Sequence, residues 1–488
     1  MQLQRAELVM DRIEAAAIGQ ESAHTGLGDL VHTLRLLWRG RANLIALWSE
    51  KDFERRIFAH QFLNRRITVV NDPAGVKHVM STNFDNYRKS VYTERALKPL
   101  VGQGLFISEG ELWRRQRRIA MPAFHRTRLR GFAEGMTQAA EEMLQRWERH
   151  KDGAELEVGG EMAAVTAEVV CRAMFSGDLG RERAAGVFEA FERYQRTLGR
   201  LDIVEMTGLP RWIPRLGARR ARKAVRQLDA LINGIIATRR REGVERNDLL
   251  DLFMNARDPD TGEAMSPSLL RDEVAVSFLA GHETTANALT WAFYLLSQHP
   301  EAENRVREEV DRVLGGRRPE YDDLTELPYV RAVIDEGLRL YPPVHIFSRE
   351  ALGDDRIGKR YVPAGSMVVI SPWLIHRHRE LWSEPDTFRP ERFLGEEVKQ
   401  HDRFAYLPFG AGPRLCIGKG FGLTEATIIL AMVAQRFRLR LRTGHVVEPL
   451  GRLTLRPRGG MPMTLHRRDA TPRSGVEAAE FEESDPVN

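Results

Sequence analysis

One cysteine in a loop of small residues constrains this chain more than any other feature. The stretch from residue 409 to residue 418 reads FGAGPRLCIG, and a long apolar run follows it from residue 421 to residue 433. Its glycines allow positive φ angles and a close approach of the backbone to a flat group. Because Cys416 stands where a helix would begin, the helix N-terminus favours its thiolate form. Backbone N–H groups of such a loop can also hydrogen-bond to the sulfur.

Two interpretations fit this loop when it is considered alone. A thiolate, a glycine-rich loop and a nearby cation, Arg414, suit an iron porphyrin with one axial cysteine and an anionic propionate. The alternative is an inert buried cysteine in a turn, which is the usual situation of a free thiol. The rest of the chain has to distinguish between them.

The loop resembles the haem-binding signature of the cytochrome P450 family. The residues that carry this resemblance are Phe409, Gly412, Arg414, Cys416 and Gly418. It implies haem b with the Cys416 thiolate as axial ligand, and it assigns Phe409, Gly418 and Arg414 to the binding of that cofactor. The resemblance extends over about residues 60–467. The fold that it implies is mainly α with a small β lobe, the cytochrome P450 fold, in a single domain.

Length and composition agree with one large domain. The 488 residues are 42% hydrophobic, and no linker rich in proline, glycine or serine divides them. We therefore expect one monooxygenase domain over residues 1–470, of which residues 1–60 are difficult to interpret. An acidic tail that is poor in apolar residues follows over residues 471–488, and we expect it to be disordered.

Charge and cysteine content limit the partners and the compartment. The net charge of +5 comes from basic residues that are interleaved with acids, so we expect no nucleic-acid partner. Cys171 lies in an apolar helical pattern and is expected to be inert; with Cys416 on iron, no disulfide can form, which suits a reducing cytoplasm. We find no signal peptide and no apolar run near the roughly 20 residues that span a bilayer. A soluble, cytoplasmic protein of the bacterial type is expected.

A second motif lies in a helix predicted over residues 266–299, whose centre reads AGHETT. Gly281 costs about 1 kcal/mol relative to alanine inside a helix, so we expect it to open space there. The stretch resembles the oxygen-activation motif of the family. The resemblance makes Thr284 the hydroxyl and Glu283 the acid that deliver protons during dioxygen cleavage, and it places Ala280 beside the substrate.

Further residues are implied as partners of the haem propionates. Trp113 and Arg117 are four residues apart, so they share one helix face and can hold a carboxylate together. The resemblance gives the same role to Arg349 and to Lys98. For Lys98, a solvated surface lysine is an equally good interpretation.

A Glu-x-x-Arg pair and a later arginine are expected to be structural. Glu336 and Arg339 lie three residues apart on one helix face, and the resemblance joins them to Arg392. One carboxylate shared by two buried guanidiniums would hold three segments together behind the haem.

The substrate is expected to be a hydrophobic small molecule, such as a fatty acid, a terpenoid or a steroid-like compound. The residues that the resemblance places near it, besides Ala280, are Val344, His345, Ile346, Leu453 and Thr454. For His345 two alternatives stay open, a hydrogen bond to substrate or a place at the pocket edge. The resemblance also identifies residues 87–107 with a loop that covers the pocket, and residues 207–214 with the roof of the substrate channel.

The activity implied is that of a monooxygenase, which places one atom of O2 in a C–H or C=C bond and releases the other as water. The chain has no flavin or iron–sulfur segment, so we expect a separate electron donor. Arg114, Arg115, Arg118 and Lys419 would make its docking face basic, which favours an acidic ferredoxin or flavodoxin with its reductase. The alternatives are a haem-thiolate sensor and a relative that uses peroxide or isomerises its substrate.

Overall fold

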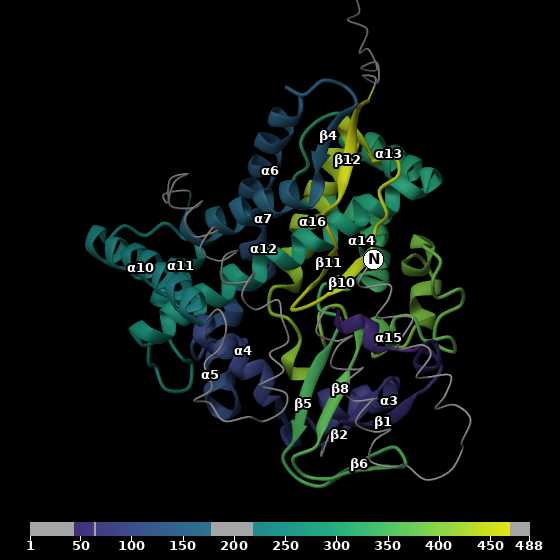
Figure 1. Cartoon of the computed structure of the whole chain (residues 1–488). Coiled ribbons are helices and arrows are strands. Elements are labelled where there is room, and N and C mark those ends of the chain that lie inside the picture. Colours follow the sequence, from purple (N-terminus) through teal and green to yellow (C-terminus); the bar gives the residue numbers. More distant parts are fainter. Residues whose placement is uncertain (1–42, 63–64, 177–217, 469–488) are drawn as a thin grey trace, which may run out of the picture.

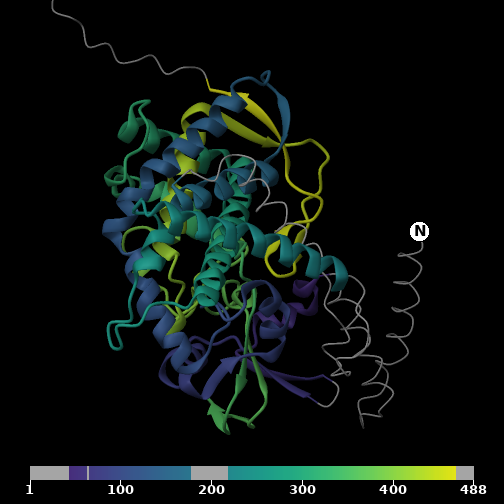
Figure 2. The ribbon, with the colours of Figure 1, turned by 90° about the vertical axis from the view of Figure 1, so that its left-hand side faces the viewer.

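The computed structural model describes residues 43–62, 65–176 and 218–468. A large helical lobe meets a small lobe that is built around a five-stranded sheet (Figure 1). The view turned by 90° keeps this sheet at one end of the molecule and the helices above it (Figure 2). The predicted mainly helical fold with a small β lobe is therefore confirmed.

The helices are α3 (Pro73–Lys77), α4 (Val91–Val101), α5 (Gly110–Ala120), α6 (Arg126–Trp147), α7 (Val158–Phe175), α10 (Ala218–Glu242), α11 (Leu249–Asn255), α12 (Pro267–Gln298), α13 (Pro300–Leu314), α14 (Pro328–Leu340), α15 (Pro372–Ile375) and α16 (Lys419–Arg436). The short helical turns are η1 (Leu44–Leu47), η2 (Glu50–Phe53), η3 (His78–Thr82), η4 (Phe84–Asn86), η5 (Met121–Phe124), η6 (Asp322–Glu326), η7 (Pro390–Phe393), η8 (Glu397–Gln400) and η9 (Gly412–Arg414). The strands are β1 (Ile57–Phe62), β2 (Arg65–Val70), β3 (Tyr87–Lys89), β4 (Ala154–Glu157), β5 (Phe347–Ala351), β6 (Asp355–Ile357), β7 (Arg360–Val362), β8 (Met367–Ile370), β9 (Phe437–Leu441), β10 (Pro449–Gly451), β11 (Leu455–Pro457) and β12 (Pro462–Arg467).

The five-stranded sheet has the order β1-β2-β8-β5-β3 and carries one side of the site. Strands β2 and β8 run parallel, and the other neighbouring pairs are antiparallel. One face buries Val70, Val368 and Ile370 in a core that also contains Leu407 and Ala411 from the segment before Cys416. The sheet therefore packs directly against the cysteine loop.

Helix α12 crosses the helical lobe (Figure 1). Its N-cap is Ser266, whose side chain accepts a hydrogen bond from the Leu269 N–H, and it ends at Gln298, so the predicted long helix is confirmed. At 1.5 Å per residue it is about 48 Å long. Gly281 has a different role from the one expected: a Cβ there would lie 2.7 Å from Val170 Cγ2 of α7. The glycine allows two helices to pack closely rather than opening space.

Three smaller sheets complete the part of the chain that the structure describes, and one of them is the pair β6 and β7. Strands β4, β12 and β9 form another, and the hairpin of β10 and β11 brings the turn with Leu453 and Thr454 toward α12. Within the described ranges, no helix is both long and apolar enough to cross a bilayer. The expected channel roof at 207–214, residues 1–42 and the acidic tail lie outside the described residues.

Candidate active site

Cys416 lies between η9 and α16 in a loop that is held tightly by its backbone. The Cys416 N–H donates to the Phe409 carbonyl at 2.9 Å. Gly412 has a φ of +65°, and a Cβ there would lie only 1.8 Å from the Met80 carbonyl oxygen of η3. Glycine is therefore required at this position, because the loop is pressed against another backbone segment.

The Cys416 thiol has the surroundings that an iron ligand needs. The side chain is exposed, although the protein around the sulfur shields it enough to raise its pKa. Burial raises the pKa of Cys416, whereas the N–H groups of Gly418 and Lys419 and the charge of Arg117 act in the opposite direction. Donors aimed at an accessible sulfur tune a thiolate ligand. Cys171, by contrast, is buried in α7, and burial raises its pKa to about 12.

Three cations lie close together on one side of this loop. Lys89 of β3 is paired directly with Arg349 of β5, an arrangement of like charges that destabilises a sheet when nothing compensates it. The Arg414 guanidinium lies 3.8 Å from the centre of the Trp113 ring. Burial, followed by the charge of Arg414, lowers the pKa of Lys89 well below its usual value, and burial lowers the pKa of Arg414 to about 10.

The acids near these cations do not balance their charge. Glu109 accepts hydrogen bonds from the Lys89 backbone N–H at 2.9 Å and from the Arg414 guanidinium. Glu273 also lies near Lys89, but burial raises its pKa to about 8, so it is mostly protonated at neutral pH. Among the described residues, Glu109 is thus the carboxylate that hydrogen-bonds to this group of three basic side chains. The two propionates of a haem would supply further negative charge beside Lys89, Arg349 and Arg414, and the residues present fit that cofactor.

The structure assembles most of the predicted propionate ligands and separates one from them. Trp113, Arg349 and Arg414 lie together with Lys89, a residue that the sequence did not single out because only the β3–β5 pairing places it there. Arg117 donates to the Leu415 carbonyl at 2.9 Å, next to the cysteine. Lys98 lies on the exposed side of α4 and forms an ion pair with Glu94 at 2.8 Å.

The centre of α12 reaches the start of α16. A Cβ on Gly422 would lie 3.4 Å from Thr285 Oγ1, which brings the two helices into contact next to Thr284. Ala280 is exposed although it lies in the middle of this core helix. The Thr284 hydroxyl donates to the Ala280 carbonyl at 2.7 Å, a bond that a bound polar group can replace.

The predicted substrate residues occupy different environments. Leu453 has 39% of its surface exposed, and Val344 and Ile346 are half-buried. His345 is completely buried, and neither ring nitrogen has a hydrogen-bond partner among the residues that the structure describes. Its ring lies against Gly451, where a Cβ would be 2.9 Å from His345 Nε2, and burial lowers its pKa to about 4, so it is neutral.

One acidic residue of the site escaped the sequence reasoning. Glu425 of α16 is completely buried and faces Thr285, and burial raises its pKa well above the usual value. Among the described residues, the Thr285 hydroxyl is the group that acts on this carboxyl, and it lowers the pKa against the larger effect of burial. The signal was present in the sequence, since Glu425 interrupts an otherwise apolar helical run.

Comparison with known proteins identifies the family. The family model described as cytochrome P450 matches residues 34–461. The chain belongs to the cytochrome P450 family. Cyclooctatin synthase of Streptomyces melanosporofaciens is 39% identical over 359 residues, which are 73% of this chain and 77% of that protein. Pentalenene oxygenase of Streptomyces avermitilis is 32% identical over 78% of this chain and 84% of that protein.

A solved structure agrees with this assignment. The crystal structure of the cytochrome P450DA heme domain matches with a TM-score of 0.76 and 29% identity, covering 85% of this chain and 90% of that one.

Another relative, from Streptomyces melanosporofaciens, is named cyclooctat-9-en-7-ol 5-monooxygenase and is 37% identical over 70% of this chain and 74% of that protein. The predicted family and the predicted enzyme class, a P450 monooxygenase, are confirmed.

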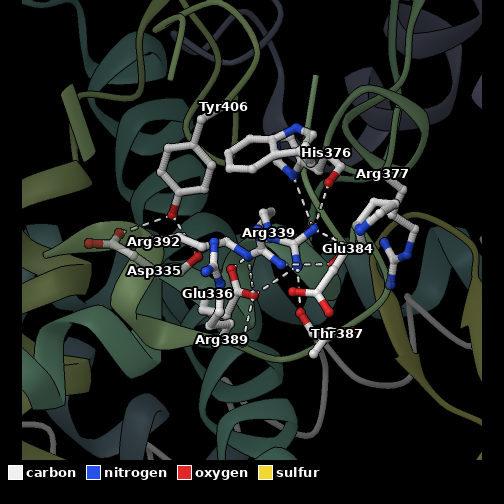
Figure 3. Close-up of polar contacts among 12 residues, drawn as sticks. Asp335, Glu336, Arg339, His376, Arg377, Glu384, Thr387, Arg389, Arg392 and Tyr406 are labelled. Atoms are coloured by element: carbon white, nitrogen blue, oxygen red, sulfur yellow. Dashed lines mark hydrogen bonds and ion pairs between the residues drawn. The ribbon is translucent and has the colours of Figure 1, made fainter. Parts of the chain in front are cut away.

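A buried ionic cluster positions the cysteine loop of this P450 (Figure 3). Glu336 accepts two hydrogen bonds from Arg339, at 2.6 and 2.8 Å, and one from Arg392 at 3.3 Å. All three side chains have no exposed surface. The two guanidiniums also donate to backbone carbonyls in the segment after α15. Arg339 donates to those of His376, Pro385 and Thr387, and Arg392 donates to that of Glu384.

His376 connects this cluster to the segment that leads to Cys416. Its Nδ1 lies 3.1 Å from the Arg339 carbonyl, and its Nε2 accepts a hydrogen bond from the Leu407 N–H at 2.7 Å. Burial lowers the pKa of His376 to about 3, so it stays neutral and can donate with one nitrogen while it accepts with the other. The cluster thereby reaches the cysteine loop through one imidazole ring.

We expect the variant Glu336→Gln to lower the free energy of unfolding by about 3–5 kcal/mol, because it leaves two buried guanidiniums without a charged partner. Urea unfolding followed by circular dichroism measures this change. The control Glu94→Gln breaks the exposed ion pair with Lys98 and should cost about 0.5 kcal/mol or less. Equal effects of the two variants would contradict the role given to Glu336.

Proposed function

We propose that this P450 places one atom of O2 in a C–H or C=C bond of a cyclic terpenoid. The observation that carries this proposal is the similarity to cyclooctatin synthase and pentalenene oxygenase over most of the chain. The expected contact residues support it, since Val344, Ile346 and Leu453 offer apolar surface. A fatty acid would need a cation for its carboxylate, and the one titratable residue among them, His345, is neutral.

The haem would be held by Cys416 as axial ligand and by Lys89, Arg349 and Arg414 at its propionates. Trp113 would support the propionate side by packing under Arg414. A haem with a thiolate ligand supplies the activation of dioxygen. The protein supplies the orientation of the substrate, the exclusion of water and the delivery of protons.

Proton delivery is the role that we propose for Thr284 and Glu283. The Thr284 hydroxyl has one proton and two acceptor sites, so it could exchange its bond to the Ala280 carbonyl for one to a polar group that binds beside α12. Glu283 is the neighbouring acid, and its carboxylate can take up a proton from solvent and pass it to the Thr284 hydroxyl. This pair favours the monooxygenase over a sensor or a relative that uses peroxide, because neither alternative requires a hydroxyl and an acid here.

The proposal is tested by supplying cyclic terpenoids with ¹⁸O2, NAD(P)H and a ferredoxin or flavodoxin with its reductase. We expect one ¹⁸O atom in the product. For Thr284→Ala we expect unchanged substrate binding but loss of most electrons to hydrogen peroxide, because positioned proton transfer contributes about a hundredfold or more. Mass spectrometry and a peroxide assay measure both quantities.

A matched control lies six residues further along the same helix. The Thr290 hydroxyl donates to the Ala286 carbonyl at 2.7 Å, the same bond that Thr284 makes. Thr290→Ala should therefore keep the wild-type coupling of NAD(P)H to product. Equal coupling in Thr284→Ala and the wild type would refute the role of Thr284, and turnover with hydrogen peroxide alone would favour the peroxide-using alternative.

The site of electron entry has to be revised from the sequence-based expectation. The arginines of α5 are engaged by acids: Arg114 pairs with Asp85 at 2.6 Å, Arg115 with Glu263 at 2.7 Å, and Arg118 with Asp260 at 3.2 Å. Buried Asp258 also pairs with both Arg115 and Arg118. These three arginines therefore do not form an open basic surface.

We place the docking face of the separate electron donor at the start of α6 and α16. Arg126, Arg128 and Lys419 are exposed there, and none forms an ion pair within the described part of the chain. The two helix starts are adjacent, because a Cβ on Gly420 would lie 2.8 Å from Leu129 Cδ1. Leu415 and Met121 add exposed apolar surface, of 37% and 55%. An acidic ferredoxin or flavodoxin suits this combination.

We expect the double variant Arg128→Glu/Lys419→Glu to lower the rate of electron transfer about tenfold at low ionic strength, because it removes charge steering. The effect should shrink as salt screens the charges. Arg240→Glu/Arg241→Glu makes the same change of charge on α10 and should leave the rate unchanged. Stopped-flow reduction measures the rate; a rate insensitive to salt and to the first pair would show that the donor docks elsewhere.

A further inference from the structure

The hairpin of β10 and β11 is fixed to two other parts of the site. The Trp291 indole N–H of α12 donates to the Leu455 carbonyl at 3.3 Å. The Leu455 N–H donates to the Pro343 carbonyl at 2.9 Å, just before the segment with Val344. The turn between the strands is therefore held between the central helix and the segment that is expected to contact the substrate.

A threonine of this turn contacts the acid beside Thr284. The Thr454 hydroxyl donates to Glu283 Oε1 at 2.6 Å and accepts from Asn287 Nδ2 at 3.3 Å. Glu283 and Asn287 are four residues apart, so they share one face of α12. Thr454 itself is buried, with 6% of its surface exposed. The Thr454 hydroxyl thus forms hydrogen bonds as donor and as acceptor to the same face of α12.

The neighbouring residue points the other way. Leu453 has 39% of its surface exposed, whereas the adjacent Thr454 is buried. A ligand that packs against Leu453 would press on the backbone that carries Thr454. Its hydroxyl would then transmit that contact to the carboxylate.

The geometry points to Thr454 as a positioning residue that holds the Glu283 carboxylate. Through the shared backbone of the turn, a substrate that contacts Leu453 would also affect the position of that carboxylate. This inference rests on the proposed role of Glu283 in proton delivery. A hydrogen bond to a carboxylate is short and strong, so it selects one orientation of an otherwise flexible side chain. In this role Thr454 acts through Glu283.

A double-mutant cycle in the purified full chain tests the contact without using activity. Thr454→Val keeps the shape of the side chain and removes the hydroxyl, and Glu283→Gln removes the charge. Because a hydrogen bond to a charged group changes an equilibrium constant by about tenfold or more, Thr454→Val should raise the unfolding constant by that factor in the wild type. It should raise it much less in the Glu283→Gln background.

Turnover tests the positioning role. We expect Thr454→Val to lower kcat and divert electrons to peroxide while KM for the terpenoid stays the same, and Thr454→Ser to restore both. Thr464→Val is the control, since the Thr464 hydroxyl contacts the Arg440 carbonyl and His466 in the β4-β12-β9 sheet rather than a residue of α12. It should leave kcat and coupling unchanged.

Three results would overturn the inference. Additive effects in the cycle would show that Thr454 and Glu283 do not interact. Wild-type coupling in Thr454→Val, with uncoupling in Glu283→Gln, would refute the positioning role and leave the proposed role of Glu283 intact. Wild-type coupling in Glu283→Gln would refute the role of Glu283 itself, and the positioning role would fail with it.

Discussion

The shared carboxylate of Glu336 is the interaction on which the arrangement of this P450 site depends. Buried ion clusters add little net stability, because the loss of hydration offsets the attraction between the charges. Their effect is that the segments they join pack in one arrangement, since a carboxylate enclosed by two guanidiniums can satisfy both in few other positions. Here the guanidiniums also bind carbonyls of the segment between α15 and η7, and His376 extends the network to Leu407. The cysteine loop is thereby fixed from behind.

The front of the site depends on an imbalance of charge. Lys89, Arg349 and Arg414 lie together although like charges repel, and burial removes the water that would screen them. Glu109 compensates only part of this charge. Binding of an anionic cofactor relieves the repulsion, so cofactor binding and folding of this region stabilise each other. The Cys416 loop is therefore held by a buried ion cluster within the protein, whereas the group of Lys89, Arg349 and Arg414 depends on the binding of an anion.

Local patterns in the sequence predicted much of this structure, and long-range contacts account for what they missed. The cysteine loop and the long helix with Thr284 are contiguous stretches, and the structure shows a loop before α16 and one long helix over Pro267–Gln298. Lys89 joins the cation group only through the pairing of β3 with β5, which no local pattern records. The same holds for Thr454, which meets Glu283 across 171 residues of chain. Arg115 looked like a free cation in the sequence because its acidic partners lie in a later loop.

The account stands on Cys416 as the iron ligand, and one spectrum tests that claim directly. The reduced protein is exposed to carbon monoxide in three forms: wild type, Cys416→Ala and Cys171→Ala. We predict the strongly red-shifted Soret band of thiolate ligation in the wild type and in Cys171→Ala, and its absence in Cys416→Ala. Loss of the band in Cys171→Ala with retention in Cys416→Ala would contradict the account.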